Sequence, residues 1–210
     1  MRSELKYILD YHEAKALLQK IKARSQYPSR YIYSLYYDTN DFINFIDSEE
    51  GTVPRIKWRI RTYSKLPNQE KKIDKIFENN FVLEKKETFE KYRSKKRIIL
   101  KNVHFDDVSI KIKKIFNFDL TPKVFVSYLR NYYILRSGVR VTCDFNLKFY
   151  QLKSSHLVNE KKNNNIIVEE KKPLDSKDTA IYDIVGDKHS RNSKYCEAVK
   201  ATFNYYNNFT

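Results

Sequence analysis

The stretch Ile56-Lys57-Trp58-Arg59-Ile60-Arg61-Thr62-Tyr63 alternates apolar and basic side chains over most of its length. Successive side chains of a β-strand point to opposite faces, so Lys57, Arg59 and Arg61 share one face and the apolar residues share the other. Three neighbouring cations repel one another, and such a face is stable only when it is well hydrated or holds a multivalent anion. The stretch therefore predicts a strand with an apolar back and an anion-binding front.

The same two-residue spacing of charged side chains recurs along the chain. It is found in Glu4 and Lys6, Glu84 and Lys86, Lys95 and Arg97, Arg140 and Asp144, and Glu169 and Lys171. Repetition on many strands predicts a sheet that curls around a charged interior, with its apolar faces covered from outside. That arrangement is the reverse of an ordinary small barrel, whose interior is filled by apolar side chains.

Periodicity and turn residues predict an α+β fold that is mainly antiparallel β, with about eight strands and peripheral helices. The whole of 1–210 is expected to form a single domain, because no linker or repeat interrupts the pattern. The predicted strands are 3–9, 31–38, 55–63, 81–87, 95–101, 123–135, 139–145 and 166–171; the helices are 11–24, 105–117 and 193–206, with a short helix or turn at 40–47 and loops at 64–80 and 153–165.

Composition narrows the class of partner. The 210 residues include 41 Lys and Arg against 26 Asp and Glu, a formal net charge of +15. Such an excess favours a polyanion: nucleic acid, an acidic membrane surface or a phosphate compound. Cys143 and Cys196 lie far apart, which excludes a disulfide framework and favours a reducing compartment. No apolar run approaches the ~20 residues of a membrane span, so a soluble cytoplasmic protein is expected.

Common catalytic motifs are missing from the sequence. There is no Gly-x-x-x-x-Gly-Lys phosphate loop, and 3 Gly in total argue against a Rossmann fingerprint. The four His show no ligand spacing, and Ser127 and Ser193 have no evident His partner. Any phosphate chemistry would therefore depend on the charged strand faces.

Strand parity places eleven basic and four acidic side chains on one charged face. Guanidinium forks fit phosphate oxygens well, whereas carboxylates suit a divalent cation that bridges phosphates, or serve to hold the cations in place. The ordinary alternative is a solvated sheet face with surface ion pairs, but recurrence on many strands favours the phosphate interpretation. The basic residues are Lys6, Lys57, Arg59, Arg61, Lys86, Lys95, Arg97, Arg130 and Arg140, with Lys171 and Lys194 near the ends, and the acidic residues are Glu4, Glu84, Asp144 and Glu169.

Nine short motifs in order carry a family resemblance. They are Arg2-Ser3-Glu4-Leu5-Lys6-Tyr7, Ser34-Leu35-Tyr36-Tyr37-Asp38-Thr39, Lys57-Trp58-Arg59-Ile60-Arg61-Thr62-Tyr63, Leu83-Glu84-Lys85-Lys86, Lys95-Lys96-Arg97, Tyr128-Leu129-Arg130-Asn131, Arg140-Val141-Thr142-Cys143-Asp144, Val168-Glu169-Glu170-Lys171 and Ser193-Lys194-Tyr195. Their order and spacing resemble the VTC-type polyphosphate polymerase domain, a branch of the triphosphate tunnel metalloenzymes with a CYTH-like fold, over nearly the whole chain.

The resemblance implies an eight-stranded tunnel barrel with a charged interior. It further implies a phosphotransferase that moves the γ-phosphate of ATP to a growing polyphosphate chain, assisted by Mn²⁺ or Mg²⁺. ATP and polyphosphate are then the expected partners and nucleic acid is not expected. Eukaryotic members carry a regulatory domain and membrane helices that this sequence lacks, which leaves room for a separate membrane protein as a partner.

The resemblance also assigns roles to residues. Arg59, Arg61, Lys95, Arg130 and Arg140 are expected to act on the transferred phosphoryl group; Lys6, Lys86, Lys171 and Lys194 are expected to bind the substrate, and strand parity adds Lys57 and Arg97. Glu169 matches the metal ligand, whereas Glu4 and Glu84 are further candidates that could instead orient lysines. Arg2 replaces the first Glu of the Glu-x-Glu-x-Lys pattern of the wider superfamily, which favours the polymerase branch.

Three other functions remain open from the sequence. A triphosphate or polyphosphate hydrolase would share the basic face and differ only in using water as the nucleophile. A non-catalytic polyphosphate-binding module would use the same charges without turnover. A basic RNA-binding barrel is the third, although RNA would need exposed aromatic residues and an open groove.

Overall fold

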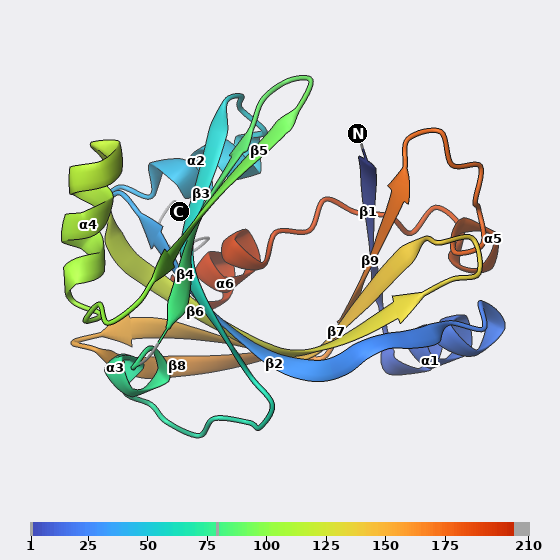
Figure 1. Cartoon of the computed structure of the whole chain (residues 1–210), viewed down its shortest axis with the longest axis horizontal. Helices are drawn as coiled ribbons and strands as arrows, with labels where there is room; N and C mark the ends of the chain where they lie inside the picture. Colours follow the sequence, from blue (N-terminus) through green and yellow to red (C-terminus); the bar gives the residue numbers. More distant parts are fainter. Residues whose placement is uncertain (1, 79, 204–210) are drawn as a thin grey trace, which may run out of the picture. The chain divides into compact units, whose positions relative to one another are not determined.

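The computed structural model describes residues 2–78 and 80–203 (Figure 1). The strands of this part are β1 (Arg2–Leu9), β2 (Arg24–Asp38), β3 (Arg55–Ser64), β4 (Phe81–Thr88), β5 (Arg93–Leu100), β6 (Thr121–Ile134), β7 (Arg140–Lys153), β8 (His156–Asn163) and β9 (Ile166–Pro173). The helices are α1 (Tyr11–Lys20), α2 (Ile43–Glu50), α3 (Ile73–Ile76), α4 (Asp107–Phe116), α5 (Tyr182–Val185) and α6 (Lys194–Phe203).

The strands form one sheet in the order β1-β9-β7-β6-β2-β3-β4-β5, and β8 pairs with β7 beside this path. The pairs β1–β9, β7–β9, β3–β4 and β4–β5 are antiparallel. The predicted α+β class, dominated by antiparallel strands, is therefore confirmed. In the described residues no helix combines the length and the apolar character that a membrane span requires.

The chain packs as two compact units, each assembled from separate parts of the sequence. Unit 1 contains Met1–Tyr31, Tyr128–Leu147 and Lys162–Asn192, and unit 2 contains Ile32–Ser127, Lys148–Lys161 and Ser193–Thr210. The long strands β2, β6, β7 and β8 contribute residues to both units. Each unit has its own apolar packing and its own charged strand face.

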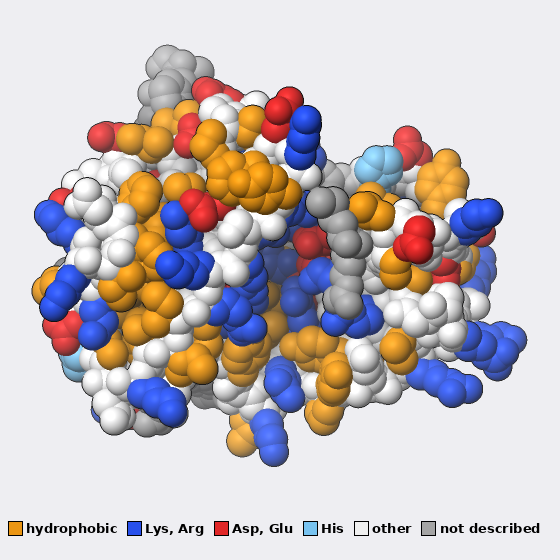
Figure 2. Space-filling model, turned by 45° about the horizontal axis from the view of Figure 1, so that its top comes forward, with side chains coloured by type: hydrophobic (Ala, Val, Ile, Leu, Met, Phe, Trp, Pro, Cys, Tyr) orange, Lys and Arg blue, Asp and Glu red, His pale blue; other side chains and the backbone are white. Residues whose placement is uncertain are grey.

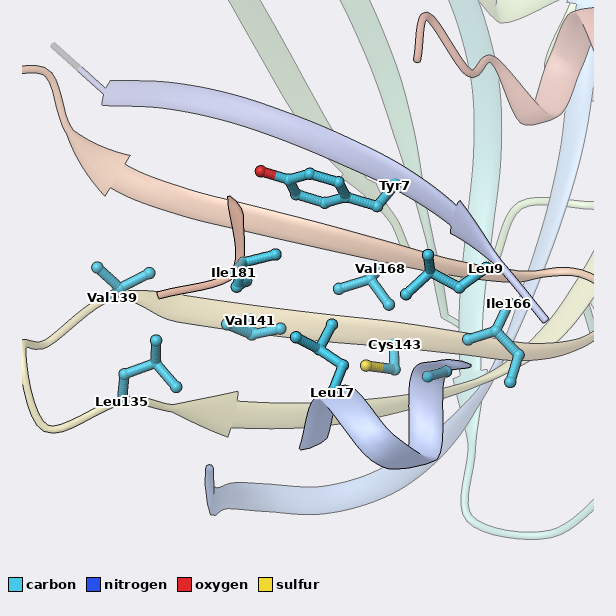
Figure 3. Packing of buried hydrophobic residues seen from close by; sticks show 11 residues of the cluster. Tyr7, Leu9, Leu17, Leu135, Val139, Val141, Cys143, Ile166, Val168 and Ile181 are labelled. Carbon is cyan, nitrogen blue, oxygen red and sulfur yellow. The ribbon is translucent and has the colours of Figure 1, made fainter. Parts of the chain in front are cut away.

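The core of unit 1 lies on the apolar face of β1, β9 and β7, where α1 and the region of α5 pack (Figure 3). Tyr7 and Leu9 of β1, Val168 of β9 and Cys143 of β7 are all buried there with Leu17 of α1. These strand residues alternate with the charged ones, because side chains two positions apart share a face. Cys143 is a core thiol, as its position in the alternation predicts.

Helix α1 begins at a capping box. The Asp10 carboxylate accepts from the Glu13 backbone N–H at 2.8 Å, and Glu13 accepts in return from the Asp10 N–H at 3.0 Å. The helix ends at Lys20 rather than at the predicted residue 24. Lys22 has a left-handed φ of 46°, which breaks the helical path before β2 begins at Arg24.

The apolar back of unit 2 is built around Trp58. Trp58 and Ile60 of β3 have no exposed surface, and the Trp58 ring packs edge-on against Phe116 of α4 at a centroid distance of 4.8 Å. Phe118 lies 5.4 Å away and the Lys85 ammonium 5.3 Å from the same ring. Helix α4 therefore covers the apolar face of β3 and β4, so the basic side chains of β3 point the other way.

The predicted loop at 153–165 is wrong. Strand β7 continues to Lys153 and turns back into β8 through Ser154 and Ser155, both with left-handed φ angles of 46° and 62°. Two such residues make the tight turn that matches strand twist, usually signalled by Asn-Gly. No Asn-Gly or similar pair is found at this turn, and the many Lys and Asn residues of β8 are typical of a loop.

The start of β2 also differs from the prediction. Strand β2 begins at Arg24 instead of residue 31, and Pro28 lies within it, in a stretch whose residues are mostly exposed. A proline is tolerated there because an exposed strand end needs no ladder hydrogen bond from it. The predicted last helix is α6, which is described to Phe203; predicted residues 204–206 lie outside the described part.

Candidate functional site

The largest gathering of charge in unit 2 comes from three neighbouring strands. Antiparallel pairing sets Arg59 of β3 opposite Glu84 of β4, and Glu84 opposite Arg97 of β5. The next row on the same face is Lys57, Lys86 and Lys95. Strand register thus places one carboxylate in the middle of a basic face. The Glu84 cluster is here Glu84 with Arg59, Arg61, Lys95 and Arg97.

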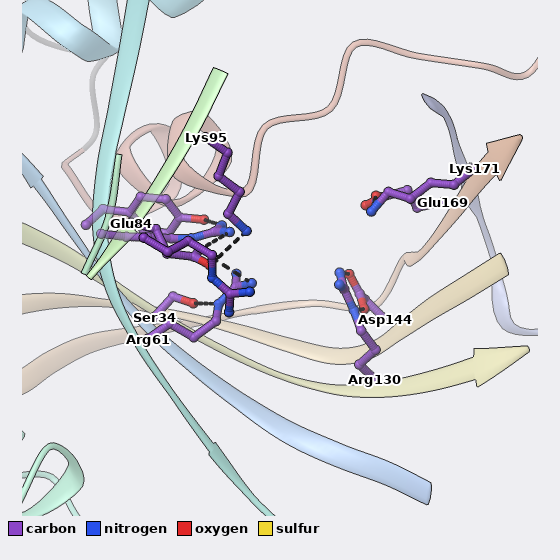
Figure 4. Close-up of polar contacts among 11 residues, drawn as sticks. Ser34, Arg61, Glu84, Lys95, Arg130, Asp144, Glu169 and Lys171 are labelled. Carbon is purple, nitrogen blue, oxygen red and sulfur yellow. Dashed lines mark hydrogen bonds and ion pairs between the residues drawn. The ribbon is translucent and has the colours of Figure 1, made fainter. Parts of the chain in front are cut away.

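Glu84 is shared by four cations (Figure 4). Its Oε2 lies 2.6 Å from Nε and Nη2 of Arg59 and 3.9 Å from Nη1 of Arg61. Its Oε1 lies 2.8 Å from Nζ of Lys95 and 3.2 Å from Nε of Arg97. The Glu84 side chain is only 1% exposed. One buried negative charge is therefore bound by four positive ones, and the cluster keeps a positive excess.

The cations of the cluster keep the Glu84 carboxylate ionised. Burial raises the pKa of Glu84, but Arg59, Arg61 and Lys95 outweigh burial and lower it from 4.5 to about 2. Burial lowers the pKa of Lys95 although Glu84 favours its charged form. Glu84 is thus ionised at neutral pH, and its charge cannot be removed by ordinary protonation.

Side chains of β2 hold the two arginines. Arg59 Nη1 donates to the Tyr36 hydroxyl at 3.1 Å, and Arg61 Nε donates to Ser34 Oγ at 3.0 Å. Burial opposes ionisation of Tyr36, but the charges of Arg59 and Arg61 hold its pKa below the usual value. The arginine heads are therefore oriented by hydrogen bonds before any ligand binds.

The first turn of α6 reaches the same face of unit 2. Lys57 Nζ donates to Ser193 Oγ at 2.9 Å, and the Cys196 backbone N–H donates to the same oxygen at 3.4 Å. Burial lowers the pKa of Lys57. Lys194 is the first residue of α6 and contributes to the positive field at Tyr36. A helix N-terminus beside lysines is an environment suited to an anion.

Charge in unit 1 is organised differently. Arg130 of β6 forms a two-point ion pair with Asp144 of β7, with Nε–Oδ1 at 2.5 Å and Nη2–Oδ2 at 2.7 Å (Figure 4). Asp144 has no exposed surface. Burial opposes the charge of Arg130, but Asp144 raises its pKa well above the usual value. Each of these charges is satisfied by the other.

The remaining charged residues of unit 1 lie on β1, β9 and β7. Glu169 forms an ion pair with Lys171, and Lys6 Nζ lies 3.8 Å from Glu4 and donates to the Asn192 carbonyl at 2.8 Å. Register sets Lys6 opposite Glu169, and Lys171 opposite Glu4. Burial raises the pKa of Glu169, but Lys171, Arg130 and Lys6 outweigh it and hold that pKa well below 4.5.

The predicted residues therefore fall into two groups. Lys57, Arg59, Arg61, Lys86, Lys95, Arg97, Lys194 and Glu84 belong to unit 2, whereas Lys6, Arg130, Arg140, Lys171, Glu4, Asp144 and Glu169 belong to unit 1. Arg140 is exposed at the start of β7, opposite Lys171 of β9. Lys and Arg side chains also occur over much of the surface in Figure 2, as the net charge requires.

Sequence reasoning missed the roles of Ser34 and Tyr36. Both precede the Asp38 end of β2 at two-residue spacing, and an aromatic residue such as Tyr36 is usually a packing residue. It does pack, stacked on Tyr195 at 5.1 Å, but its hydroxyl also contacts Arg59. Parity predicts that Ser34 and Tyr36 share one face of β2. Their closeness to the arginines of β3 could not be predicted, because it depends on β2 and β3 being neighbours in the sheet.

The described residues offer few side chains that could together bind a metal ion. Across 2–78 and 80–203, no group of three or more His, Cys, Asp and Glu side chains could hold a metal ion. Glu4 and Glu169 lie on adjacent strands and diagonally on the same face of unit 1, because Glu4 pairs with Lys171 and Glu169 pairs with Lys6. Two carboxylates fit Mg²⁺ or Mn²⁺ when phosphate oxygens of a substrate supply further ligands.

Solved structures of similar fold exist. A protein from Pyrococcus horikoshii OT3 is 14% identical, with 95% of this chain and 99% of that chain covered at a TM-score of 0.54. A putative adenylate cyclase from Vibrio parahaemolyticus is 11% identical, with coverage of 95% and 98% and a TM-score of 0.53. A putative adenylyl cyclase from Hippeastrum, described as having a dominant triphosphatase activity, is 10% identical, with coverage of 94% and 95% and a TM-score of 0.51.

At these identities the likeness shows the fold alone. No curated protein matches the sequence. The family model of the VTC domain matches residues 1–203, which include all the charged strand residues described above. The motifs that carry the resemblance in the sequence are thus embedded in a match over nearly the full length, and the chain belongs to the VTC domain family.

Proposed function

We propose that this protein binds ATP and polyphosphate on its charged strand faces and transfers the γ-phosphate of ATP to the polyphosphate chain, assisted by Mn²⁺ or Mg²⁺. The observation that carries the proposal is the Glu84 cluster, in which four cations surround one buried carboxylate. A phosphate chain carries about one negative charge per unit, so it would neutralise the excess that Glu84 leaves.

The arrangement suits phosphoryl transfer because that reaction depends on positioning and charge stabilisation. The transition state spreads negative charge over the equatorial oxygens of the transferred group, and preoriented guanidinium groups stabilise it. Arg59 and Arg61 are already oriented by Glu84, Tyr36 and Ser34. In this proposal Arg59, Arg61 and Lys95 of unit 2 act on the transferred group, and the same role for Arg130 and Arg140 of unit 1 stays a prediction.

The other predicted cations hold the substrate. They are Lys6, Lys57, Lys86, Arg97, Lys171 and Lys194. Three of them, Lys57, Lys86 and Arg97, belong to closely spaced rows on β3, β4 and β5, which fit a narrow unbranched phosphate chain better than a nucleic acid, whose bases would need stacking partners. No covalent enzyme intermediate is required, because the nucleophile is the terminal phosphate of the growing chain.

Glu169, with Glu4, is proposed to hold the divalent ion together with phosphate oxygens of the substrate. When bound, such an ion would neutralise part of the negative charge of the phosphate groups. Glu84 is proposed to have the other role considered for it, that of ordering the cations, because both of its oxygens already lie against basic groups. Lys171 would have to release an oxygen of Glu169 for the ion to bind.

A second candidate function is hydrolysis of triphosphate or polyphosphate. It is favoured by the Hippeastrum protein of similar fold, which is described as having a dominant triphosphatase activity. The same basic face would serve both reactions, because only the nucleophile differs. Water replaces the polyphosphate end in the hydrolase.

The deciding experiment incubates the purified protein with γ-labelled ATP and Mn²⁺ and resolves the products by chain length. Labelled chains support the polymerase, and labelled free phosphate without chains supports the hydrolase. Tight tripolyphosphate binding without either product supports a binding module. Absence of both binding and products contradicts all three.

Three variants make this experiment specific. Arg59→Ala should abolish most turnover, whereas Lys113→Ala should leave it unchanged, because Lys113 is exposed on α4 and paired with Asp119. Glu169→Gln should abolish metal-dependent turnover while the protein stays folded. Unchanged activity of Glu169→Gln across a metal titration would exclude this ligand assignment.

A further inference from the structure

Asp38, at the end of β2, is a buried carboxylate with no exposed surface. It accepts from the backbone N–H groups of Asn44 and Phe45, at 3.0 Å and 2.9 Å, and from Asn44 Nδ2 at 2.7 Å. These backbone groups belong to the first turn of α2, whose own N-cap residue, Phe42, makes no side-chain cap. Asp38 therefore caps α2 from outside the helix.

The same carboxylate also binds α6. The Tyr195 hydroxyl donates to Oδ2 of Asp38, and the Tyr195 ring is 1% exposed. The ring stacks on Tyr36 at 5.1 Å and meets Phe45 edge-on at 6.3 Å. Burial and the charge of Asp38 raise the pKa of Tyr195, which keeps its hydroxyl a donor. One carboxylate thus joins β2, α2 and α6.

Tyr195 directly follows the two residues at the start of α6 that lie near the Glu84 cluster. Lys194 precedes it directly, and Ser193, two residues earlier, accepts from Lys57 Nζ at 2.9 Å. On the other side, the Tyr36 ring that stacks on Tyr195 carries the hydroxyl bonded to Arg59. The two tyrosines therefore form a continuous contact from Asp38 to the cluster.

We propose that Asp38 and Tyr195 are positioning residues, which hold the first turn of α6 so that Lys194 meets the phosphate ligand at the Glu84 cluster. This inference rests on the proposed function, because it assumes that the cluster binds phosphate. A buried carboxylate is costly to desolvate, and apolar packing alone could attach a helix. A directional hydrogen bond fixes the helix orientation more strictly than apolar contact does.

The test uses Tyr195→Phe, which removes one hydroxyl and keeps both aromatic contacts. The matched control is Tyr37→Phe on β2, because the buried Tyr37 hydroxyl makes no hydrogen bond within the described residues. Calorimetry with tripolyphosphate should show affinity about tenfold weaker for Tyr195→Phe and unchanged for Tyr37→Phe. Equal affinities for Tyr195→Phe and the wild type would overturn the inference.

A double-variant cycle separates positioning from general stability. Lys194→Ala should weaken binding, and adding Tyr195→Phe to it should weaken binding no further, since Tyr195 acts through Lys194. Additive losses would overturn the inference. Asp38→Asn serves as the second variant and should show the same non-additivity; each variant is confirmed folded by near-UV circular dichroism before titration.

Failure of the inference can be told apart from failure of the proposed function. If Arg59→Ala and Lys194→Ala both leave tripolyphosphate affinity unchanged, the cluster is not the phosphate site, and both the proposed function and the positioning role are wrong. If those two variants weaken binding while Tyr195→Phe does not, only the positioning role is wrong.

Discussion

The two units share the same strand alternation but differ in the ratio of basic to acidic side chains on the charged face. In unit 1 the acidic and basic residues of the charged face are nearly equal in number, with ion pairs of Arg130 with Asp144, Lys171 with Glu169 and Lys6 with Glu4. In unit 2 a single carboxylate, Glu84, serves four cations. Alternation alone therefore does not set the charge balance of a strand face. What matters is how many basic residues the register gathers around each acid.

The comparison also separates two uses of a buried carboxylate. Asp144 forms a two-point ion pair with Arg130, so its loss removes the closest compensating charge of a buried arginine. Glu84 lowers repulsion among several cations while leaving an excess for a ligand. An added polyanion should therefore substitute for Glu84 and not for Asp144, and the three predictions below test this contrast.

Asp144→Asn should have the largest effect on stability. Removing one partner of a buried ion pair typically costs about 3–5 kcal/mol, because the other charge stays buried and unpaired. Denaturant unfolding at pH 7 should show this loss, and tripolyphosphate should not restore it. Arg140→Gln, an exposed change in the same strand, is the control and should have little effect. Wild-type stability of Asp144→Asn would contradict the paired interpretation.

Glu84→Gln should have the next largest effect, with a distinctive pH dependence. The folded-state pKa of about 2 lies below the ordinary 4.5, so ionised Glu84 stabilises the fold by about 3 kcal/mol at neutral pH. This contribution is complete above pH 4.5 and is lost as pH falls through about 2. The stability difference between wild type and variant should therefore be constant from neutral pH down to pH 4.5, shrink between pH 4.5 and about 2, and be gone below that.

Ligand rescue completes the Glu84 test. Tripolyphosphate should raise the melting temperature of Glu84→Gln more than that of the wild type, because the variant has one more uncompensated cation. Equal shifts in the two proteins would mean that the cluster does not hold the anion. If the stability difference between the wild type and Glu84→Gln did not change with pH, Glu84 would not be held ionised by its neighbours.

Arg97→Gln should have the smallest effect on stability and still weaken binding. Its side chain is 52% exposed, so the free energy of unfolding should change by less than about 0.5 kcal/mol. Tripolyphosphate affinity should fall about threefold, and more at low salt, because a partly exposed charge is screened by ions. Lys96→Gln is the matched control on the same strand, since Lys96 lies over the Phe116 ring on the apolar side.

Many features of the site could be predicted from the sequence. Parity placed Lys57, Arg59 and Arg61 opposite Trp58 and Ile60, and the burial of Trp58 and Ile60 with the contacts of Arg59 and Arg61 to Glu84 confirms it. Parity depends only on backbone geometry, which every strand shares. The hairpin of β7 and β8 escaped prediction because Ser154 and Ser155 can adopt left-handed φ angles without the usual Asn-Gly signal.

The sequence by itself determined which side chains share a face of each strand. Only the tertiary structure decided which of them meet, because the meeting residues lie far apart in the chain. Arg59 and Glu84 are 25 positions apart, Lys57 and Ser193 are 136 apart, and Asp38 and Tyr195 are 157 apart. Local periodicity carries no information on strand register or on where a distant helix docks, and these set the balance of charge in each unit.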